Sequence, residues 1–545
     1  MEELKIPEKT ISLDVGPKPE ELEELNLSNE WIGDAGVEAL CQHNLSKLKT
    51  LNLELNGISD EGALHLALNN SLANLEQLNL EKNHIDANGA AALSYNPLWT
   101  KLQVLNLQRN NIGAKGAAHL SKNEVWSDLR ELHLKENCIS SQGASELGAS
   151  MIWTNLRVLN LEKNNIESGG AYGLANNKSW TNLEILNLDR NDIGPEGAAA
   201  LTRNLSWGKL RVLNIRWNNI QDTGASALAN NPTWVNLETL DLEKNGIGAE
   251  GVAAISGKSA WKNLVHLNLA SNRAGPEGAT ALGKNIFWSN LQTLELQENR
   301  IRSKGAIGLS DNISWINLET IDLDENGIDD EGAVALAKNS VWEKLKGLNL
   351  ERNKISCEGV SALAANTAWK QLTCLNLSGN QLKASGAIQL GKNDFWLSLE
   401  VLKLAGNKIG DEGVAGLAMN THWTNLKELN LHDNDISAKG AVAIGGNQVW
   451  KKLKVLELYR NKIGSEGAAA LAKNQIWTEL EVLDLQKNQI SFEGVVALSQ
   501  QEAWKNLSNL NLQENDINTQ AKEELKNLKK KLPNCKILIN PSEIL

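Results

Sequence analysis

The chain has 545 residues, of which 41% are hydrophobic, and it carries a formal net charge of −12 with a pI near 5.4. This hydrophobic content excludes a disordered chain. Because an acidic surface repels phosphate backbones and anionic lipids, we expect neither a nucleic-acid partner nor a membrane partner. No apolar run approaches the ~18 residues of a membrane helix, and the charged N-terminal decapeptide lacks the apolar core of a secretory signal.

Residues 1–21 precede any repetition in the sequence, and we predict that they cap the N-terminal end of the fold. Within this segment Ile11, Leu13 and Val15 alternate with polar residues, which is the period-2 pattern of a short strand. We therefore expect a strand that covers the first apolar layer of the segment that follows.

Residues 22–531 consist of nineteen copies of one unit, whose usual length is 27 residues. The first copies begin at Leu22, Leu48 and Leu75, and from Leu75 to Leu507 the register has no insertion or deletion. The shared pattern is L-x-x-L-x-L-x-x-N-x-I-x-x-x-G-A-x-x-L-x-x-N-x-x-W, and positions are numbered from its first leucine. A unit this short cannot bury its own apolar side chains, so neighbouring copies must stack into one continuous array.

Each copy is predicted to contain one short strand and one helix. The alternation in Leu105-Asn106-Leu107 indicates a strand whose leucines face inward. A helix follows Ile112 and its equivalents, and Pro195 and Pro276 occupy the first helical turn, where proline is tolerated. Asn at position 22 is expected to form a left-handed C-terminal cap. The predicted N-cap position is occupied by Ser59, Ser140, Ser356, Ser437 and Ser491.

Two further columns of the repeat contain unusual residues. Tryptophan at position 25 recurs in sixteen consecutive copies, from Trp99 to Trp504, and explains the excess of 18 Trp over 3 Phe and 3 Tyr. We expect these rings to be buried and to stack on one another, whereas Trp31 and Trp217 should be more exposed. Asparagines in the middle of the predicted strands are expected to bond one another as a ladder. They include Asn52, Asn79, Asn106, Asn160, Asn187, Asn214 and Asn268.

The repeat resembles that of the leucine-rich-repeat family, and it is most similar to the ribonuclease-inhibitor-like class, which has a helix in every repeat. The resemblance implies an α/β solenoid shaped like a horseshoe, with parallel strands on the concave face and helices on the convex face. It also implies that Asn at position 9, such as Asn83, bonds backbone groups where each strand ends.

The C-terminal end departs from the repeat, as the end of a solenoid should. The segment 519–532 is typical of an amphipathic helix with a basic end. Residues 532–545 are predicted to form a capping strand, because Cys535, Ile537 and Asn540 match strand positions of the repeat.

The sequence contains no pattern that indicates catalysis. Its eight His and five Cys residues show no zinc-ligand spacing, and there is no Walker A, G-x-S-x-G or nucleotide-binding glycine motif. We therefore predict a protein that is not an enzyme and that needs no metal and no cofactor. The odd, scattered cysteines are typical of reduced thiols, which favours a cytoplasmic protein, and we expect a monomer.

The function that we predict is that of a scaffold that binds a protein partner on the concave face, as the resemblance implies. The resemblance extends to NOD-like receptors, although this sequence lacks their nucleotide-binding domain. Ribonuclease inhibition is disfavoured because the inhibitor's frequent cysteines are absent. The Gly-Ala-x-x-Leu-Ala segment resembles GALA-type bacterial effectors, which would be delivered into a host cell. A GTPase-activating protein of the Ran type is another alternative, as is an array without a specific partner.

Candidate binding residues are those that depart from the repeat at positions 5, 7 and 8, because residues copied in most repeats serve the fold. One departure is Arg216-Trp217, and the other is a run of four adjacent predicted strands, spaced about 4.8 Å apart. The run contains Ser378, Gly379, Lys403, Ala405, Gly406, His432, Asp433, Tyr459 and Arg460. Ser378 and Ala405 should form a shallow floor beside His432 and Tyr459. Tyr, Trp and Arg are enriched at binding hot spots.

Overall fold

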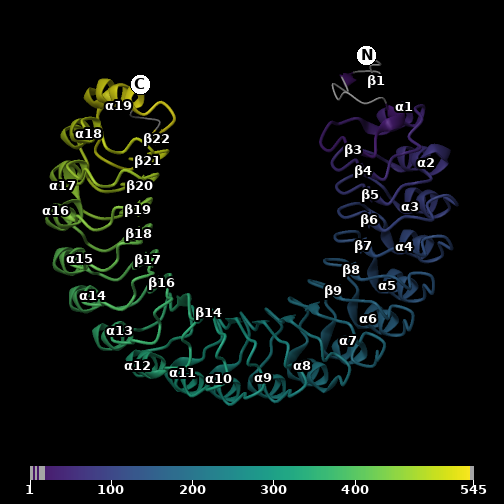
Figure 1. The fold of residues 1–545 in the computed structure, drawn as a ribbon, viewed down its shortest axis with the longest axis horizontal. Helices are drawn as coiled ribbons and strands as arrows, with labels where there is room; N and C mark the ends of the chain where they lie inside the picture. Colours follow the sequence, from purple (N-terminus) through teal and green to yellow (C-terminus); the bar gives the residue numbers. More distant parts are fainter. Residues whose placement is uncertain (1–3, 7–8, 12–18, 541–545) are drawn as a thin grey trace. The chain divides into compact units, whose positions relative to one another are not determined.

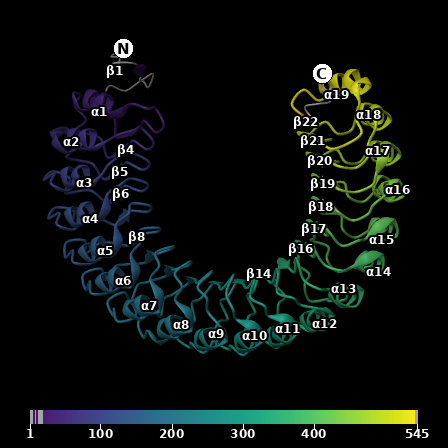
Figure 2. The same ribbon diagram turned by 180° about the vertical axis from the view of Figure 1, so that it is seen from behind.

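The computed structural model describes residues 4–6, 9–11 and 19–540. The chain divides into two compact units, Met1–Asn272 and Arg273–Leu545. Each unit has one layer of parallel strands and one layer of helices, and in each the helices lie on the outer side of the strands (Figures 1 and 2). The predicted α/β solenoid is confirmed.

In the first unit a parallel sheet runs in chain order from β3 to β12. Its strands are β3 (Glu24–Asn26), β4 (Thr50–Asn52), β5 (Gln77–Asn79), β6 (Val104–Asn106), β7 (Glu131–His133), β8 (Val158–Asn160), β9 (Ile185–Asn187), β10 (Val212–Asn214), β11 (Thr239–Asp241) and β12 (His266–Asn268). Its helices are η1 (Pro19–Glu21), α1 (Gly33–Cys41), α2 (Asp60–Leu68), η2 (Asn70–Leu72), α3 (Ala87–Ser94), α4 (Gly113–Ser121), α5 (Ser140–Gly148), α6 (Glu167–Ala175), α7 (Gly194–Leu201), α8 (Gln221–Asn230) and α9 (Ala249–Ser256).

The second unit repeats this arrangement, with a parallel sheet from β13 to β22. Its strands are β13 (Thr293–Glu295), β14 (Thr320–Asp322), β15 (Gly347–Asn349), β16 (Cys374–Asn376), β17 (Val401–Lys403), β18 (Glu428–Asn430), β19 (Val455–Glu457), β20 (Val482–Asp484), β21 (Asn509–Asn511) and β22 (Lys536–Leu538). Its helices are α10 (Gly275–Gly283), α11 (Arg302–Ser310), α12 (Asp330–Lys338), α13 (Cys357–Ala364), α14 (Lys383–Leu390), α15 (Gly410–Ala418), α16 (Ala438–Gly446), α17 (Gly464–Ala472), α18 (Phe492–Ser499), η3 (Thr519–Ala521) and α19 (Lys522–Lys531).

The strands of each sheet pair in register, so residues at one repeat position form a row across the sheet. For example, Leu213 of β10 pairs with Leu240 of β11. The middle residue of each repeat strand from β3 to β21 is buried against the helices, while its two neighbours face outward because side chains alternate along a strand. The outward residues at positions 3 and 5, with those at positions 7 and 8 beyond the strand, form what we term the strand face.

Both ends of the chain contain short elements outside the repeats. At the N-terminus β1 (Leu4–Ile6) pairs antiparallel with β2 (Lys9–Ile11). The predicted covering strand is therefore seen only at Ile11, and Leu13 and Val15 lie outside the described residues. At the C-terminus η3 and α19 form the predicted helix, and β22 extends the sheet beside β21.

The tryptophan column forms the core at the loop side of the repeats, as predicted. All sixteen rings from Trp99 to Trp504 are at most 3% exposed, whereas Trp31 is 70% and Trp217 38% exposed. Stacking on the next copy is seen at three places, with ring centroids 6.3–6.5 Å apart. None of the sixteen indole N–H groups has a hydrogen-bond acceptor among the described residues, so the rings contribute apolar packing rather than polar contacts.

Asparagine at position 9 joins consecutive repeats through their backbones. The Asn164 side-chain amide donates to the carbonyl of Leu134, one repeat earlier, at 2.8 Å. Its oxygen accepts the backbone N–H groups of Asn137 and Ile139, also in the preceding repeat, at 3.0 and 3.3 Å. This confirms the role implied by the family resemblance, because these bonds satisfy backbone groups that a bare turn would leave buried and unpaired.

The prediction for Asn at position 22 is wrong, because these residues are not left-handed caps and none has a positive φ. The Asn177 amide instead donates to Gly148 and Ser150 of the preceding repeat, at 3.0 and 2.6 Å. Its oxygen accepts the N–H of Trp180 at 2.9 Å. This second asparagine column therefore also joins repeats, and it fixes the backbone at the buried tryptophan.

The serine N-caps are confirmed only in part. Ser59 and Ser437 cap α2 and α16 by accepting a backbone N–H from two residues later. Ser356 stands at the N-cap of α13 but makes no capping bond, and its hydroxyl donates to Asp330 in the preceding repeat. Ser491 also makes no capping bond, and Ser140 lies inside its helix with φ +63°.

The expected amide ladder in the middle of the strands is seen between Asn79 and Asn52, at 3.0 Å. In other copies the side chain bonds locally, as where the Asn160 oxygen accepts the N–H of Glu162 at 3.1 Å. The local bond holds the chain as it leaves the strand, so this column serves the fold.

Candidate functional site

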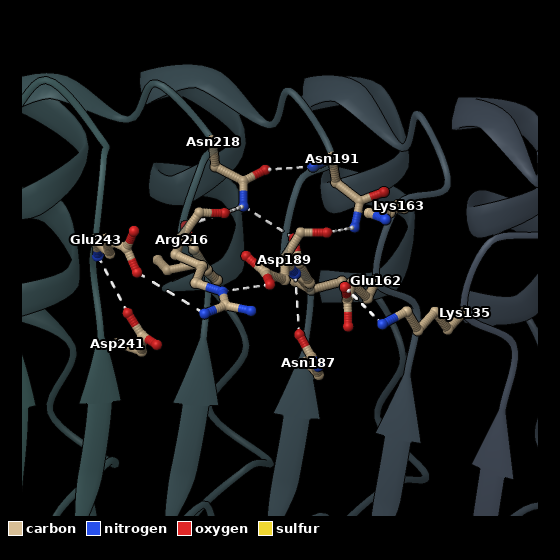
Figure 3. Close-up of polar contacts among 12 residues, drawn as sticks. Lys135, Glu162, Lys163, Asn187, Asp189, Asn191, Arg216, Asn218, Asp241 and Glu243 are labelled. Carbon is tan, nitrogen blue, oxygen red and sulfur yellow. Dashed lines mark hydrogen bonds and ion pairs between the residues drawn. The ribbon is translucent and has the colours of Figure 1, made fainter. Parts of the chain in front are cut away.

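The residues that depart from the repeat lie on the strand face of both units. The two groups differ in how many contacts their side chains make with neighbouring repeats. In the first unit the Arg216 Nε donates to Asp189 Oδ2 at 2.5 Å, and its Nη1 lies 3.8 Å from Glu243 Oε2 (Figure 3). All three residues occupy position 7, on adjacent repeats. Arg216 therefore lies between two carboxylates in the same row of the strand face.

Asp189 is the most unusual carboxyl of this group, because its side chain is only 2% exposed. Burial raises the pKa of Asp189 to about 6, although the bond from Arg216 acts in the opposite direction. Glu162, on the preceding repeat, pairs with Lys135 at 2.9 Å. The acidic and basic side chains of this region thus engage one another (Figure 3).

Trp217 is also held by its neighbours. The Arg190 guanidinium lies 4.6 Å from the centroid of its ring, and the Lys244 ammonium lies 3.5 Å from it. Cations over an aromatic ring are attracted by its negative faces. Sequence reasoning singled out Arg216 and Trp217 but missed these partners, although the 27-residue spacing from Asp189 to Arg216 to Glu243 predicts them.

In the second unit the departing residues form a different surface over β16 to β19, which we term the β16–β19 patch. Ser378 and Ala405, the small side chains expected to form its floor, are 7% and 4% exposed. Gly379 and Gly406 follow them with φ +67° and +63°, where glycine carries no steric penalty. The side chains here are small at positions 7 and 8, where many other repeats carry a charged side chain.

Two aromatic rings stand beside this floor. His432 and Tyr459 stack with their ring centroids 4.0 Å apart and their planes 15° apart. The His432 Nδ1 lies 2.8 Å from the side-chain oxygen of Asn430, and burial lowers the pKa of His432. Asp433 and Arg460, which follow the two rings, are exposed. The stack thus presents a neutral, rigid pair of rings at the surface.

A hollow adjoins the patch, and sequence reasoning missed it. Gly347 stands at position 3, where neighbouring strands carry Thr320 and Cys374, and it lines a cavity of about 380 Å³. Lys403, which the sequence analysis selected, lies at its edge and pairs with Glu428 at 3.0 Å. The cavity is lined by Thr293, Leu294, Glu295, Thr320, Ile321, Asp322, Gly347, Leu348, Asn349, Cys374, Asn376 and Lys403.

The strand face beside the hollow is acidic. Burial raises the pKa of Asp322, and burial together with Glu351 raises the pKa of Asp324 to about 6. One guanidinium, that of Arg352, lies within 3.7–3.9 Å of Asp324, Glu325 and Glu351. One positive charge thus lies among three carboxylates, and the strand face beside the hollow has a net negative charge.

Within residues 4–6, 9–11 and 19–540, no group of three His, Cys, Asp or Glu residues is arranged to hold a metal ion. No helix of the same residues is long and apolar enough to cross a bilayer.

The comparison with known families identifies the chain's class. A family model described as "Leucine Rich repeat" matches well over half of the chain, at residues 21–41, 44–67, 71–94, 100–121, 127–148, 154–175, 181–201, 209–229, 235–256, 262–283, 289–310, 316–337, 343–364, 371–391, 397–418, 422–445, 451–472 and 478–499. The chain belongs to the leucine-rich-repeat family. No curated protein matches the sequence.

Solved structures that match the chain differ strongly from it in sequence. A leucine-rich-repeat protein of Leptospira interrogans is 22% identical, with 96% of both chains covered and a TM-score of 0.39. A plant peptide hormone receptor, RGFR1 in complex with RGF2, is 17% identical, with 91% of this chain and 92% of that chain covered and a TM-score of 0.42. The ectodomain of the Arabidopsis thaliana receptor kinase GASSHO1/SCHENGEN3 is 19% identical, with 96% and 74% covered and a TM-score of 0.32.

Proposed function

We propose that the protein is a non-catalytic scaffold that binds a protein partner on the strand face of its second unit, at the β16–β19 patch. The observation that carries the proposal is the His432–Tyr459 stack, 4.0 Å between centroids, beside a floor made by Ser378 and Ala405. Rigid aromatic groups beside a small-residue floor provide a large contact area at low cost in side-chain entropy.

The alternative surface on the first unit supports binding less well. Arg216 and Trp217 are of the residue types common at hot spots, but their charges and ring faces contact Asp189, Glu243, Arg190 and Lys244. A partner would have to replace these contacts before gaining its own. A partner that binds Tyr459 in the β16–β19 patch would not have to replace contacts of this kind.

The partner chemistry follows from the charge around the patch. Exposed Arg460 follows the stack, whereas the strand face of β14 and β15 carries Asp322, Asp324 and Glu351. A partner with an apolar or aromatic centre and a basic group on the side facing β14 and β15 would be complementary to both. We further propose that the protein acts as a monomer in the cytoplasm.

The test compares the parent with the double variant Tyr459→Ala/Arg460→Ala in affinity capture from a cell lysate. A protein retained by the parent should bind the variant at least about five- to thirtyfold more weakly, because hot-spot truncations cost about 1–2 kcal/mol or more. The matched control is Glu81→Ala/Lys82→Ala, which changes the same two repeat positions in the first unit. A captured protein that is lost equally from both variants, or from neither, would contradict the proposed location.

A further inference from the structure

Repeat 11, which starts at Leu291, departs from the other copies in the loop that leads into its helix. It carries Arg300, Arg302 and Lys304 at positions 10, 12 and 14. Position 12 is Gly or Ser in most copies, and position 14 is most often Glu. No other copy has a basic residue at all three positions.

These substitutions do not improve the fold. Arg302 has φ +56°, a conformation that six other copies meet with glycine at the same position. A side chain other than glycine is strained there. Arg302 and Lys304 also lie in the first turn of α11, where the helix dipole disfavours positive charge. The positive charges of Arg302 and Lys304 therefore do not stabilise the first turn of α11.

The three cations border a cavity of about 500 Å³. Its centre is Gly327, at position 10 of repeat 12, where a glycine with φ +69° leaves open space between Arg300 and Lys354. The cavity is lined by Arg300, Arg302, Ser303, Lys304, Glu325, Asn326, Gly327, Asp329 and Lys354. All of these residues belong to the second unit.

The charges around the cavity are not balanced. Lys304 pairs with Glu277 at 2.9 Å, but Arg300, Arg302 and Lys354 form no ion pair with any residue that the structure describes. Both carboxylates of the lining already have partners. Asp329 caps α12 and accepts the hydroxyl of Ser303, while Glu325 lies 3.8 Å from Arg352. Three unpaired cations thus face one cavity of a chain whose net charge is −12.

We propose that this cavity binds a phosphate group that carries two or more negative charges, and that the cavity is large enough for a diphosphate. The forked guanidinium groups of Arg300 and Arg302 match the oxygens of a phosphate, and Lys354 contributes a further positive charge from the opposite side of Gly327. Because Gly327 has no side chain, the anion can approach the backbone closely.

The experiment titrates the full chain with sodium pyrophosphate and with inorganic phosphate at low ionic strength, by isothermal calorimetry. A third titration uses a phosphoserine peptide and its unphosphorylated form. Binding of pyrophosphate or phosphate alone identifies a free phosphate compound as the ligand, and binding that needs the phosphoserine identifies a phosphorylated protein. If none of these probes binds, the proposal is overturned.

Two variants locate the site. Arg300→Gln/Arg302→Gly removes two cations and gives position 12 its usual glycine, and we expect at least tenfold weaker binding with thermal stability equal to or above that of the parent. Gly327→Asp places a carboxylate in the cavity and should abolish binding. The backbone at position 10 tolerates aspartate, because Asp192 and Asp435 occupy this position in other repeats with φ +52° and +57°.

The control is Lys408→Gln, which removes a cation at position 10 of repeat 15, away from the cavity lining. Its affinity for the probe should equal that of the parent. Equal weakening in Lys408→Gln and Arg300→Gln/Arg302→Gly would show that net charge alone attracts the anion, and it would overturn the assignment. Full affinity in Gly327→Asp would do the same.

Discussion

Repeat 8 in the first unit and the β16–β19 patch in the second depart from the same pattern at the same positions, with opposite results. In repeat 8 the departures add long side chains, and neighbouring repeats engage them through Asp189, Glu243, Arg190 and Lys244. In the patch Ser378 and Ala405 remove side chains and leave the stacked rings beside a low floor.

The difference shows that an unusual residue on a repeat surface is not by itself a binding residue. Residues 27 positions apart lie side by side, so each departure must be considered with the same position in the two neighbouring copies. Where those copies offer an opposite charge, the new side chain stabilises the array. Where they offer small residues, it leaves surface for a partner.

The largest expected effect lies in the buried tryptophan column that the two units share, where the difference between the two regions should disappear. Trp180→Ala in the first unit and Trp288→Ala in the second each remove a fully buried ring, and each should cost about 3–5 kcal/mol of unfolding free energy. Denaturant unfolding measures both. Trp288→Phe should cost much less, because the indole N–H has no acceptor. A loss below ~1 kcal/mol in either alanine variant would contradict a shared core.

The next effect separates the two regions. Arg216→Ala leaves the buried Asp189 without its partner and should destabilise the protein by about 2 kcal/mol, which is below the usual loss for a fully buried pair because Arg216 is itself 38% exposed. Arg460→Ala, at an exposed position of the patch, should change stability by less than ~0.5 kcal/mol. Equal losses of stability in the two variants would contradict a difference between repeat 8 and the β16–β19 patch.

The pH dependence of stability sharpens the same contrast. Burial raises the pKa of Asp189 to about 6 in the folded state, above its unfolded value near 3.8. Between these values the folded state binds the proton and the unfolded state does not, so this group makes stability fall as pH rises from 4 to 6. Relative to Asp189→Asn, the parent should therefore gain about 1–2 kcal/mol on acidification from pH 7 to pH 4. Parallel curves for the two proteins would contradict a buried carboxyl.

The smallest effect concerns Trp217. Removing its ring in Trp217→Ala loses the contacts with Arg190 and Lys244, each of which is worth about 0.5–1 kcal/mol at an exposed site. We expect a total loss of about 1 kcal/mol in denaturant unfolding, with Trp217→Phe intermediate. A variant as stable as the parent would show that the ring is free for a partner, which would make the two regions alike.

The fold was predictable because repetition shows which residues are structural. The 27-residue register located the strands, helices and buried tryptophans. The role of Asn177 was not predictable, because local helix-cap rules do not show that its amide reaches the preceding repeat. The hollow lined by Gly347 was missed because no motif in the sequence marks it. That all nineteen repeats form one continuous array stays a prediction.

The two asparagine columns give the array a direction. Asn164 and Asn177 both bond backbone groups of the repeat before their own. At the C-terminal end the Asn540 oxygen accepts the N–H of Glu514 at 3.1 Å in the same sense. During synthesis on a ribosome, each repeat therefore emerges with buried polar groups that only the following 27 or so residues can satisfy. Each repeat can therefore complete its fold only after the next repeat has been synthesised.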